Sequence, residues 1–223
     1  MVPGGHGGLA PLTPAPGRSV TRGHGLLEGF LARQRTRRAN ALIPEQSRGG
    51  RLLDIGCGTY PLFLLNTRFA ERYGLDREVP SDLIEPGLVL RSHDVAVSDH
   101  LPFDSEYFDV VTMLAVFEHL DRPVLTRLLG DILRVLKPGG MFVMTTPAGW
   151  TDRLLKAMGR FGLVSREEVD EHRGTYSHAQ IVAVAESAGF DRALIRYGSF
   201  EAGLNLWLTA RRTPSAPRST PGS

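Results

Sequence analysis

The segment RLLDIGCG, residues 51–58, constrains the fold more than any other part of the chain. Its short apolar run, bounded by glycine, predicts a buried strand over residues 51–55. Gly56 and Gly58 then predict a tight turn into a helix that begins near Pro61, because proline suits a first helical turn. In parallel α/β sheets such a unit directs the amides of the helix N-terminus toward a ligand. Taken alone, the glycines indicate either a nucleotide-like ligand or simply a tight turn.

The rest of the chain alternates short apolar runs with longer amphipathic segments. Further strands are expected near residues 72–75, 88–92, 108–114, 141–146, 193–197 and 204–210. Helices are expected near residues 24–42, 123–136 and 178–188. Alternation of this kind predicts an α/β fold with a mostly parallel sheet and crossover helices, in which the last two strands form an antiparallel edge pair.

The helix near residues 24–42 is expected to bury an apolar face and to expose a basic one. The apolar face consists of Leu26, Leu27, Phe30, Leu31, Ala41 and Leu42. The basic side chains are those of Arg33, Arg35, Arg37 and Arg38. A solvated helix face explains these arginines better than nucleic-acid binding does, and the net charge of the chain is only +2. No nucleic-acid partner is therefore expected.

The length of 223 residues suits one α/β domain, which we expect over residues 23–211. The Gly- and Pro-rich residues 1–22 and the tail 212–223 are expected to be disordered. A polar insert at about residues 150–176 is expected to act as a lid. Cys57 is the only cysteine, which favours a reducing compartment. Without an apolar stretch of about 18–20 residues or a signal-peptide pattern, we expect no transmembrane segment and a cytoplasmic location.

Two aspartates follow the next two predicted strands. Asp76 lies 22 positions beyond Asp54, where a carboxylate can accept both hydroxyl protons of a ribose. Asp94 follows the third strand, where its carboxylate can receive an adenine amino group. A nicotinamide dinucleotide would require a small residue at position 61, which is Pro61 in this chain. The pattern therefore favours a different nucleoside cofactor.

Six motifs in order carry a family resemblance: LLDIGCGT, YGLDRE, HDVAVSDHLPF, FDVVTMLAVFEHL, LKPGGMFVMTTP and ESAGF. Together they resemble the class I methyltransferases that depend on S-adenosylmethionine (SAM), over about residues 40–210. The resemblance is greatest to the small-molecule group that includes the ubiquinone and menaquinone biosynthesis methyltransferases. It implies a Rossmann-like, seven-stranded, mostly parallel sheet with helices on both faces. It also implies SAM as the cofactor and a small molecule as the methyl acceptor.

The same resemblance implies a role for each motif residue. The residues around the methionine end of SAM would be Asp54, Gly56, Cys57, Gly58 and, at the end of the fourth strand, Leu114. Asp76 with the adjacent Arg77 would bind the ribose, and Asp94 with Val95 the adenine. Tyr60 stands where the family usually has a third glycine, which would narrow the loop or place an aromatic ring beside the cofactor.

The acceptor is expected to be an oxygen of a metabolite, lipid precursor or sugar. His119 follows the fourth strand and is the first candidate for a general base, because a neutral imidazole can take a hydroxyl proton near pH 7. His172, in the polar insert, is a second candidate. Packing alone would equally explain His119, and a surface loop would explain His172. The metal-binding Glu-x-x-Glu-His run of ubiquinone O-methyltransferases is incomplete here, because Ala115 replaces its first glutamate, and no metal is expected.

Two other functions remain open on the sequence. A non-catalytic module that binds SAM, or serves as a partner subunit, is suggested only by Tyr60. A nucleic-acid or protein methyltransferase is suggested only by the arginines of the first helix. The chain lacks the Asp/Asn-Pro-Pro-aromatic signature of enzymes that methylate base amino groups, since Met113, Leu114 and Ala115 occupy that position. The sequence carries no signal for an oligomeric state.

Overall fold

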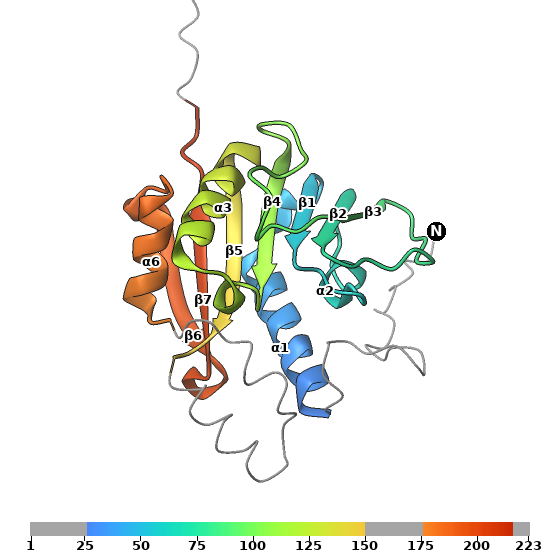
Figure 1. The fold of residues 1–223 in the computed structure, drawn as a ribbon, viewed down its shortest axis with the longest axis horizontal. Coiled ribbons are helices and arrows are strands. Elements are labelled where there is room, and N and C mark those ends of the chain that lie inside the picture. Colours follow the sequence, from blue (N-terminus) through green and yellow to red (C-terminus); the bar gives the residue numbers. More distant parts are fainter. Residues whose placement is uncertain (1–25, 150–175, 216–223) are drawn as a thin grey trace, which may run out of the picture.

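A computed structural model of the protein describes residues 26–149 and 176–215 (Figure 1). Its strands are β1 (Arg51–Ile55), β2 (Glu71–Asp76), β3 (Leu88–Ser92), β4 (Phe108–Leu114), β5 (Leu136–Pro147), β6 (Ile195–Phe200) and β7 (Asn205–Arg211). Its helices are α1 (Leu26–Leu42), α2 (Leu62–Leu65), α3 (Arg122–Val135) and α6 (His178–Ser187). The predicted lid at residues 150–176 lies almost entirely outside the described residues, as do residues 1–22 and most of the predicted tail.

The seven strands form one sheet in the order β3-β2-β1-β4-β5-β7-β6. Neighbouring strands from β3 to β5 are parallel, whereas β7 is antiparallel to both β5 and β6. The predicted Rossmann-like sheet with an antiparallel C-terminal edge pair is therefore confirmed. No helix among the described residues is long and apolar enough to cross a membrane.

Helices cover both faces of the sheet because its central strands are apolar on both sides. On one face, Leu53, Val111 and Phe142 pack in a buried cluster with residues of α3 and α6, the helices nearest the viewer in Figure 1. On the other face, buried residues of the same strands pack against α1 and α2; they include Leu52, Val110 and Val143. Alternate residues of each strand thus serve opposite layers.

The predicted inner face of α1 is partly wrong. Phe30 is 50% exposed, and among residues 29–42 of this helix the buried ones are Thr36 and Ala39. A hydrogen-bond network at the end of α1 fixes this rotation, since the amide of Asn40 donates to the carbonyl oxygen of Asn66 at 3.1 Å. Arg38, expected on the solvent side, instead stacks over the ring of Trp207 at 4.7 Å. Packing against the sheet, rather than helix periodicity, sets which face of α1 is inside.

Strand β5 begins five residues earlier than expected, and α3 ends at Val135 rather than Leu136. Leu136 pairs with Phe108, and Lys137 donates a 2.7 Å hydrogen bond to Asp109. The register then shifts, because the next pair is Val110 with Met141, so the Pro-Gly-Gly segment lies at an irregularity of the pairing with β4. Directly after β7, Arg212 donates to backbone carbonyls that include that of Arg134 at 3.1 Å.

Candidate functional site

The carboxyl ends of β1, β2, β4 and β5 lie at one edge of the sheet, toward which β4 and β5 point in Figure 1. After β1 the chain turns at Gly56 and Gly58, whose φ angles are +77° and +74°. Residues with a Cβ rarely adopt this left-handed region. The amides of Gly56 and Cys57 donate to the carbonyl oxygen of Leu75 at 2.7 and 3.1 Å, which ties the turn to the end of β2.

The two glycines have different surroundings. A Cβ added to Gly56 would collide with the side chain of Val116, so the turn touches the segment that follows β4. A Cβ added to Gly58 would approach no atom closer than 4.0 Å. The backbone at Gly58 therefore faces open space, as a loop that receives a ligand against its main chain requires.

Asp76 lies at the end of β2, beside this loop. Its Oδ2 accepts a hydrogen bond from the amide of Gly58 at 2.9 Å. Its Oδ1 accepts from the amide of Glu78 at 3.4 Å. Each carboxylate oxygen has two lone pairs, so a carboxylate in this position is suited to the hydroxyl groups of a ribose. The next residue, Arg77, has an exposed side chain, and its carbonyl oxygen accepts a 2.7 Å hydrogen bond from Ser92.

Asp94 and Val95 follow β3 on the same side of the sheet. The Oδ1 of Asp94 accepts from the amide of Ala96 at 2.9 Å, which closes a short turn and holds the carboxylate in place. Val95 is half-buried, and its carbonyl oxygen accepts from Arg127 of α3 at 3.0 Å. An apolar side chain beside a fixed carboxylate is suited to an adenine ring and its amino group.

Asp54 is the buried carboxylate of the site, with 3% exposure. Its Oδ1 accepts a 2.6 Å hydrogen bond from Thr112, its register partner on β4. Burial raises the pKa of Asp54 to about 7. The hydrogen bond from Thr112 opposes this shift, and the negative charge of Asp76 adds a smaller increase of the pKa.

Cys57 and Leu114 occupy different positions relative to the loop. The Cys57 side chain is 7% exposed and packs in the cluster beneath α1. Only the backbone of Cys57 therefore contributes to the ligand-facing side of the loop. Burial also raises the pKa of the Cys57 thiol well above its usual range, which keeps the sulfur protonated. Leu114 is half-buried at the end of β4, next to Ala115 and Val116.

The residues after β4 form a short 3₁₀ turn, Phe117–His119. Ala115 has a left-handed φ of +56°, and its amide donates to the carbonyl oxygen of Thr145 at 2.9 Å. Glu118 is 2% exposed and accepts from Thr146 at 2.9 Å, whereas the side chain of His119 is exposed. The side chain of Glu118 therefore lies in the core, whereas that of the next residue, His119, lies at the surface.

The second base candidate, His172, lies outside the described residues. Among the residues that the structure describes, no cluster of three or more His, Cys, Asp or Glu side chains could hold a metal ion. Tyr60 is half-buried in the loop after Gly58.

Three residues of this edge were missed by the sequence reading. Thr112, Thr145 and Thr146 are buried polar side chains on the central strands β4 and β5. A signal was present, because each threonine interrupts an otherwise apolar run, in FDVVTML and MFVMTT. A buried hydroxyl in such a run requires a hydrogen-bond partner and so indicates a polar site.

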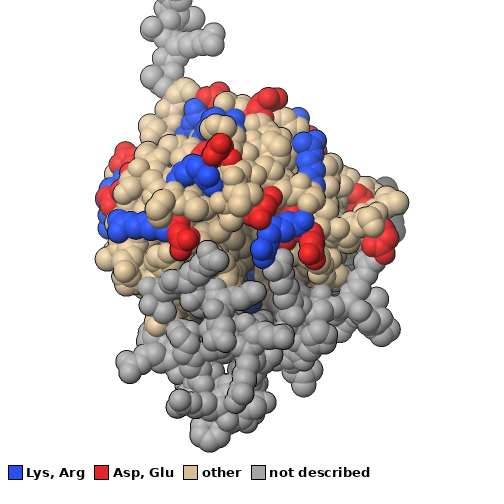
Figure 2. Space-filling view, in the orientation of Figure 1, with Lys and Arg blue, Asp and Glu red and all other residues tan. Residues whose placement is uncertain are grey.

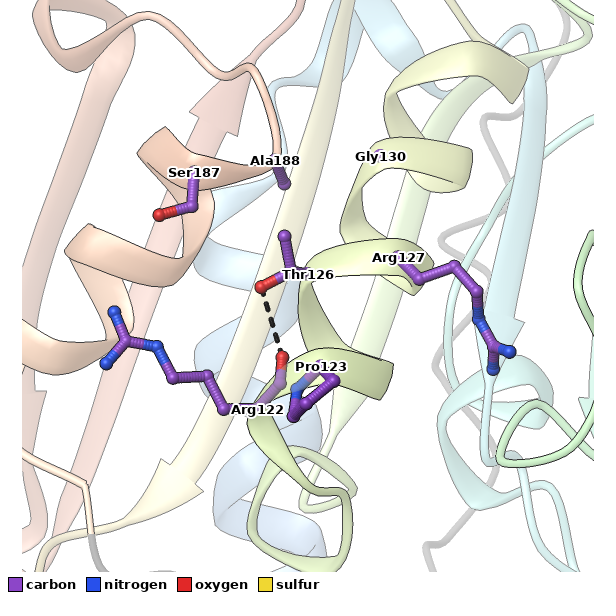
Figure 3. Close-up of a pocket in the computed structure, with 7 residues that line it drawn as sticks. All are labelled: Arg122, Pro123, Thr126, Arg127, Gly130, Ser187 and Ala188. Atoms are coloured by element: carbon purple, nitrogen blue, oxygen red, sulfur yellow. Dashed lines mark hydrogen bonds between the residues drawn. The ribbon is translucent and has the colours of Figure 1, made fainter.

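A separate surface groove lies between α3 and α6, far from the glycine loop in sequence (Figure 3). It has a volume of about 660 Å³ and contains a hydrogen bond of 3.1 Å from Thr126 to the carbonyl oxygen of Arg122. None of the predicted site residues that the structure describes lines it. On the same face of the molecule, basic and acidic side chains of the described residues are interspersed (Figure 2).

Comparisons with known proteins agree with this architecture. A ubiquinone biosynthesis O-methyltransferase of Paraburkholderia phymatum is 29% identical over 154 residues, which are 65% of this chain and 63% of that relative. This chain thus spans less than two thirds of the length of that curated relative.

Two solved structures share the fold at low sequence identity. An S-adenosylmethionine-dependent methyltransferase from Mesorhizobium loti is 19% identical, with a TM-score of 0.57 over 77% of this chain and 94% of that one. Human N-acetylserotonin methyltransferase, in complex with SAM, is 18% identical, with a TM-score of 0.58 over 84% of this chain and 54% of that one.

The family comparison covers most of the domain. A family model described as a methyltransferase domain matches residues 27–193, which include the glycine loop, Asp76, Asp94 and the segment after β4. The motif order, the strand order and this match lead to the same conclusion. The chain belongs to the family of SAM-dependent methyltransferase domains.

Proposed function

We propose that this chain transfers the methyl group of SAM to an oxygen atom of a small-molecule acceptor. The observation that carries the proposal is the convergence of Gly58, Asp76 and Asp94 at the carboxyl edge of the sheet. The open backbone of the turn suits the methionine end of SAM. The carboxylate of Asp76 beside the turn suits the ribose, and the carboxylate of Asp94 after the next strand suits the adenine. The O-methyltransferase named among the relatives supports oxygen as the acceptor atom.

The residues at this edge fit the cofactor. The open space at Gly58 would receive the methionine end, and Asp54 and Leu114 would lie beside it. Asp76, held by the Gly58 amide, would bind the ribose hydroxyls, with the backbone of Arg77 alongside. Asp94 would receive the adenine amino group, and Val95 would pack against the ring. The Cys57 backbone contributes to the turn, while its sulfur remains in the core.

Catalysis by such a site depends on alignment. Bound SAM supplies a sulfonium whose methyl group is already activated for in-line displacement. The chain contributes a rigid platform at the ends of β4 and β5, where Ala115 is bonded to Thr145, and this platform positions the acceptor. His119 follows directly and has an exposed imidazole that would take the proton of an acceptor hydroxyl. The predicted lid, with His172, would exclude water from the reacting atoms.

The direct test is transfer of a tritiated methyl group from SAM to a panel of hydroxylated aromatic, sugar and lipid-precursor acceptors. The proposal expects label in a product that survives mild base, as a methyl ether does and a methyl ester does not. Intact protein that binds SAM but labels no acceptor in the panel or in a cell extract would favour the non-catalytic module instead.

The role of His119 has its own test. For His119→Ala we expect kcat to fall about 10²-fold or more and the acidic limb of its pH profile to disappear, with SAM affinity unchanged. His100→Ala is a matched control, because the His100 side chain is 77% exposed and lies on the loop between β3 and β4. An unchanged pH profile in His119→Ala would remove His119 as the base and leave methyl transfer itself intact.

A further inference from the structure

Six buried side-chain nitrogen or oxygen atoms among the described residues have no hydrogen-bond partner. Four of the six are Arg38 Nε, Thr145 Oγ1, Glu201 Oε1 and Trp207 Nε1. Buried polar atoms are nearly always paired, and those that are not often mark the place of a ligand or ordered water. These four atoms belong to residues of α1, β5, β7 and the β6–β7 turn. Their grouping indicates that a bound molecule supplies the missing hydrogen bonds.

Register and stacking place three of these residues together. Thr145 on β5 and Trp207 on β7 are direct partners in the antiparallel pair, so their side chains lie on the same face of the sheet. The Arg38 guanidinium lies 4.7 Å from the centre of the Trp207 ring, which shows that this is the face covered by α1. The indole in turn packs flat on Gly198, where any Cβ would collide with it.

Glu201 lies on the 3₁₀ turn Glu201–Gly203, which joins β6 to β7 at the carboxyl edge of the sheet. Its Oε2 accepts a hydrogen bond from the side chain of Asn205, while Oε1 has no partner among the described residues. Both Glu201 and Ala202 have left-handed φ angles, of +52° and +53°. Non-glycine residues persist in this region only where their surroundings hold them, and such positions cluster at binding sites.

The four residues continue the cofactor edge. Thr145 is the register partner of Leu114, and its carbonyl oxygen receives the amide of Ala115 at 2.9 Å. Leu114 is the residue expected beside the methionine end of SAM. A molecule held by Thr145 and Trp207 would therefore lie next to the methyl-donor site, on the side away from Asp76.

The charges indicate what kind of molecule fits. Arg38 Nε, Trp207 Nε1 and Thr145 Oγ1 are all hydrogen-bond donors, whereas Glu201 Oε1 accepts or shares a proton. Arg35 and Arg38 contribute +2 and Glu201 contributes −1, which leaves +1 in this region. Burial raises the pKa of Glu201, and the hydrogen bond from Asn205 and the positive charge of Arg35 oppose this shift only in part.

We propose that Arg38, Trp207 and Thr145 form an acceptor subsite that binds an oxyanion, carboxylate or phosphate, of a hydroxylated substrate. The unpaired donors of these three residues would hydrogen-bond to the oxyanion, and Glu201 would accept a hydroxyl proton of the same molecule. The subsite thereby selects acceptors that carry a negative charge. This inference rests on the proposed methyl-transfer function, because it assigns the acceptor of that same site.

The experiment measures binding to the full chain saturated with S-adenosylhomocysteine, so that no turnover occurs. Trp150→Phe leaves Trp207 as the only tryptophan, and its fluorescence then reports ligand at the subsite. The probes are 3,4-dihydroxybenzoate, phenyl phosphate and the uncharged catechol. We expect one of the two anions to bind about 10-fold or more tightly than catechol. Tighter binding of 3,4-dihydroxybenzoate would identify a carboxylate as the bound group, and tighter binding of phenyl phosphate would identify a phosphate.

Arg38→Gln should abolish this preference, while Arg37→Gln, an exposed neighbour on the same helix, should retain it. Thr145→Val, which keeps the side-chain volume, should weaken anion binding about 3- to 10-fold. Unchanged affinity for S-adenosylhomocysteine in each variant shows that the fold is intact.

Two results would overturn the subsite: neither anion is preferred over catechol, or Arg38→Gln binds the anion as well as Arg37→Gln does. A wild-type protein that fails to bind S-adenosylhomocysteine at all would instead contradict the proposed function.

Discussion

The amide of Gly58 donates a 2.9 Å hydrogen bond to the carboxylate of Asp76. The turn after β1 and the last residue of β2 are thereby fixed relative to each other before any ligand arrives. Pre-organisation of this kind reduces the free-energy cost of ordering the site on binding. The glycine loop and Asp76 are therefore held as one unit, although Gly58 and Asp76 are 18 positions apart in the chain.

The two loop glycines should respond differently to substitution. Gly58→Ala should cost about 1–2 kcal/mol of folding stability, because only the left-handed φ opposes it, and should also place a methyl group where the cofactor approaches. Gly56→Ala adds a collision with Val116 and should cost about 1–3 kcal/mol more. Thermal unfolding ranks the two variants. Equal losses of stability in the two variants would contradict this prediction, because they would show that the Val116 side chain moves aside without a free-energy cost.

The buried carboxyl of Asp54 should make stability depend on pH. Its pKa is about 7 in the folded protein and near 3.8 when unfolded, so the folded state holds more protons between these values. Stability is therefore greatest below the unfolded pKa and falls as pH rises toward 7. Relative to Asp54→Asn, the wild type should lose about 2–4 kcal/mol between pH 4 and 8.

Urea unfolding at several pH values measures this difference. Asp104→Asn, an exposed position, serves as the control and should follow the wild type. Parallel curves for the wild type and Asp54→Asn would exclude a raised pKa at Asp54.

A second buried carboxylate, Asp131 on α3, should behave in the opposite way. Burial alone would raise the pKa of Asp131, but hydrogen bonds from Arg134 and the amide of Leu101 outweigh it and hold the pKa below its usual value. Its contribution is then present above the unfolded pKa and lost as pH falls through the folded one.

Asp131→Ala should cost about 3–5 kcal/mol at pH 7, because it leaves Arg134 without its carboxylate. Asp99→Ala, whose side chain is 86% exposed beside Arg127, should change stability by about 1 kcal/mol or less. Denaturant unfolding of the two variants tests the contrast, and similar losses would contradict it.

The sequence predicted the sheet well because its central strands are short apolar runs with glycine or proline at their ends. The bounds of β1, β3 and β4 agree with the structure, and Asp76 and Asp94 lie at the carboxyl edge as their positions after β2 and β3 required. Local signals suffice for β1 and β4, which are buried on both faces, and the exposed edge strand β3 is marked by its own short apolar run after Gly87.

Features that depend on distant contacts were not predictable in this way. The inner face of α1 is set by Asn40 and Arg38, whose partners Asn66 and Trp207 lie on other elements. The early start of β5 depends on the contact of Lys137 with Asp109. The gathering of unpaired polar atoms around Trp207 likewise arises only when α1 packs against β5 and β7, since helix periodicity carries no information about tertiary partners.

Calorimetric titration of SAM into the wild type, Asp76→Ala and Asp104→Ala tests the central claim most directly. We expect wild-type binding in the micromolar range and a loss of about 1–3 kcal/mol in Asp76→Ala, from the missing ribose contacts and the released Gly58 amide. Asp104→Ala, a remote exposed carboxylate, should bind as the wild type does. No heat of binding with the intact wild type, or equal affinity in Asp76→Ala, would contradict the assignment of this edge as the SAM site.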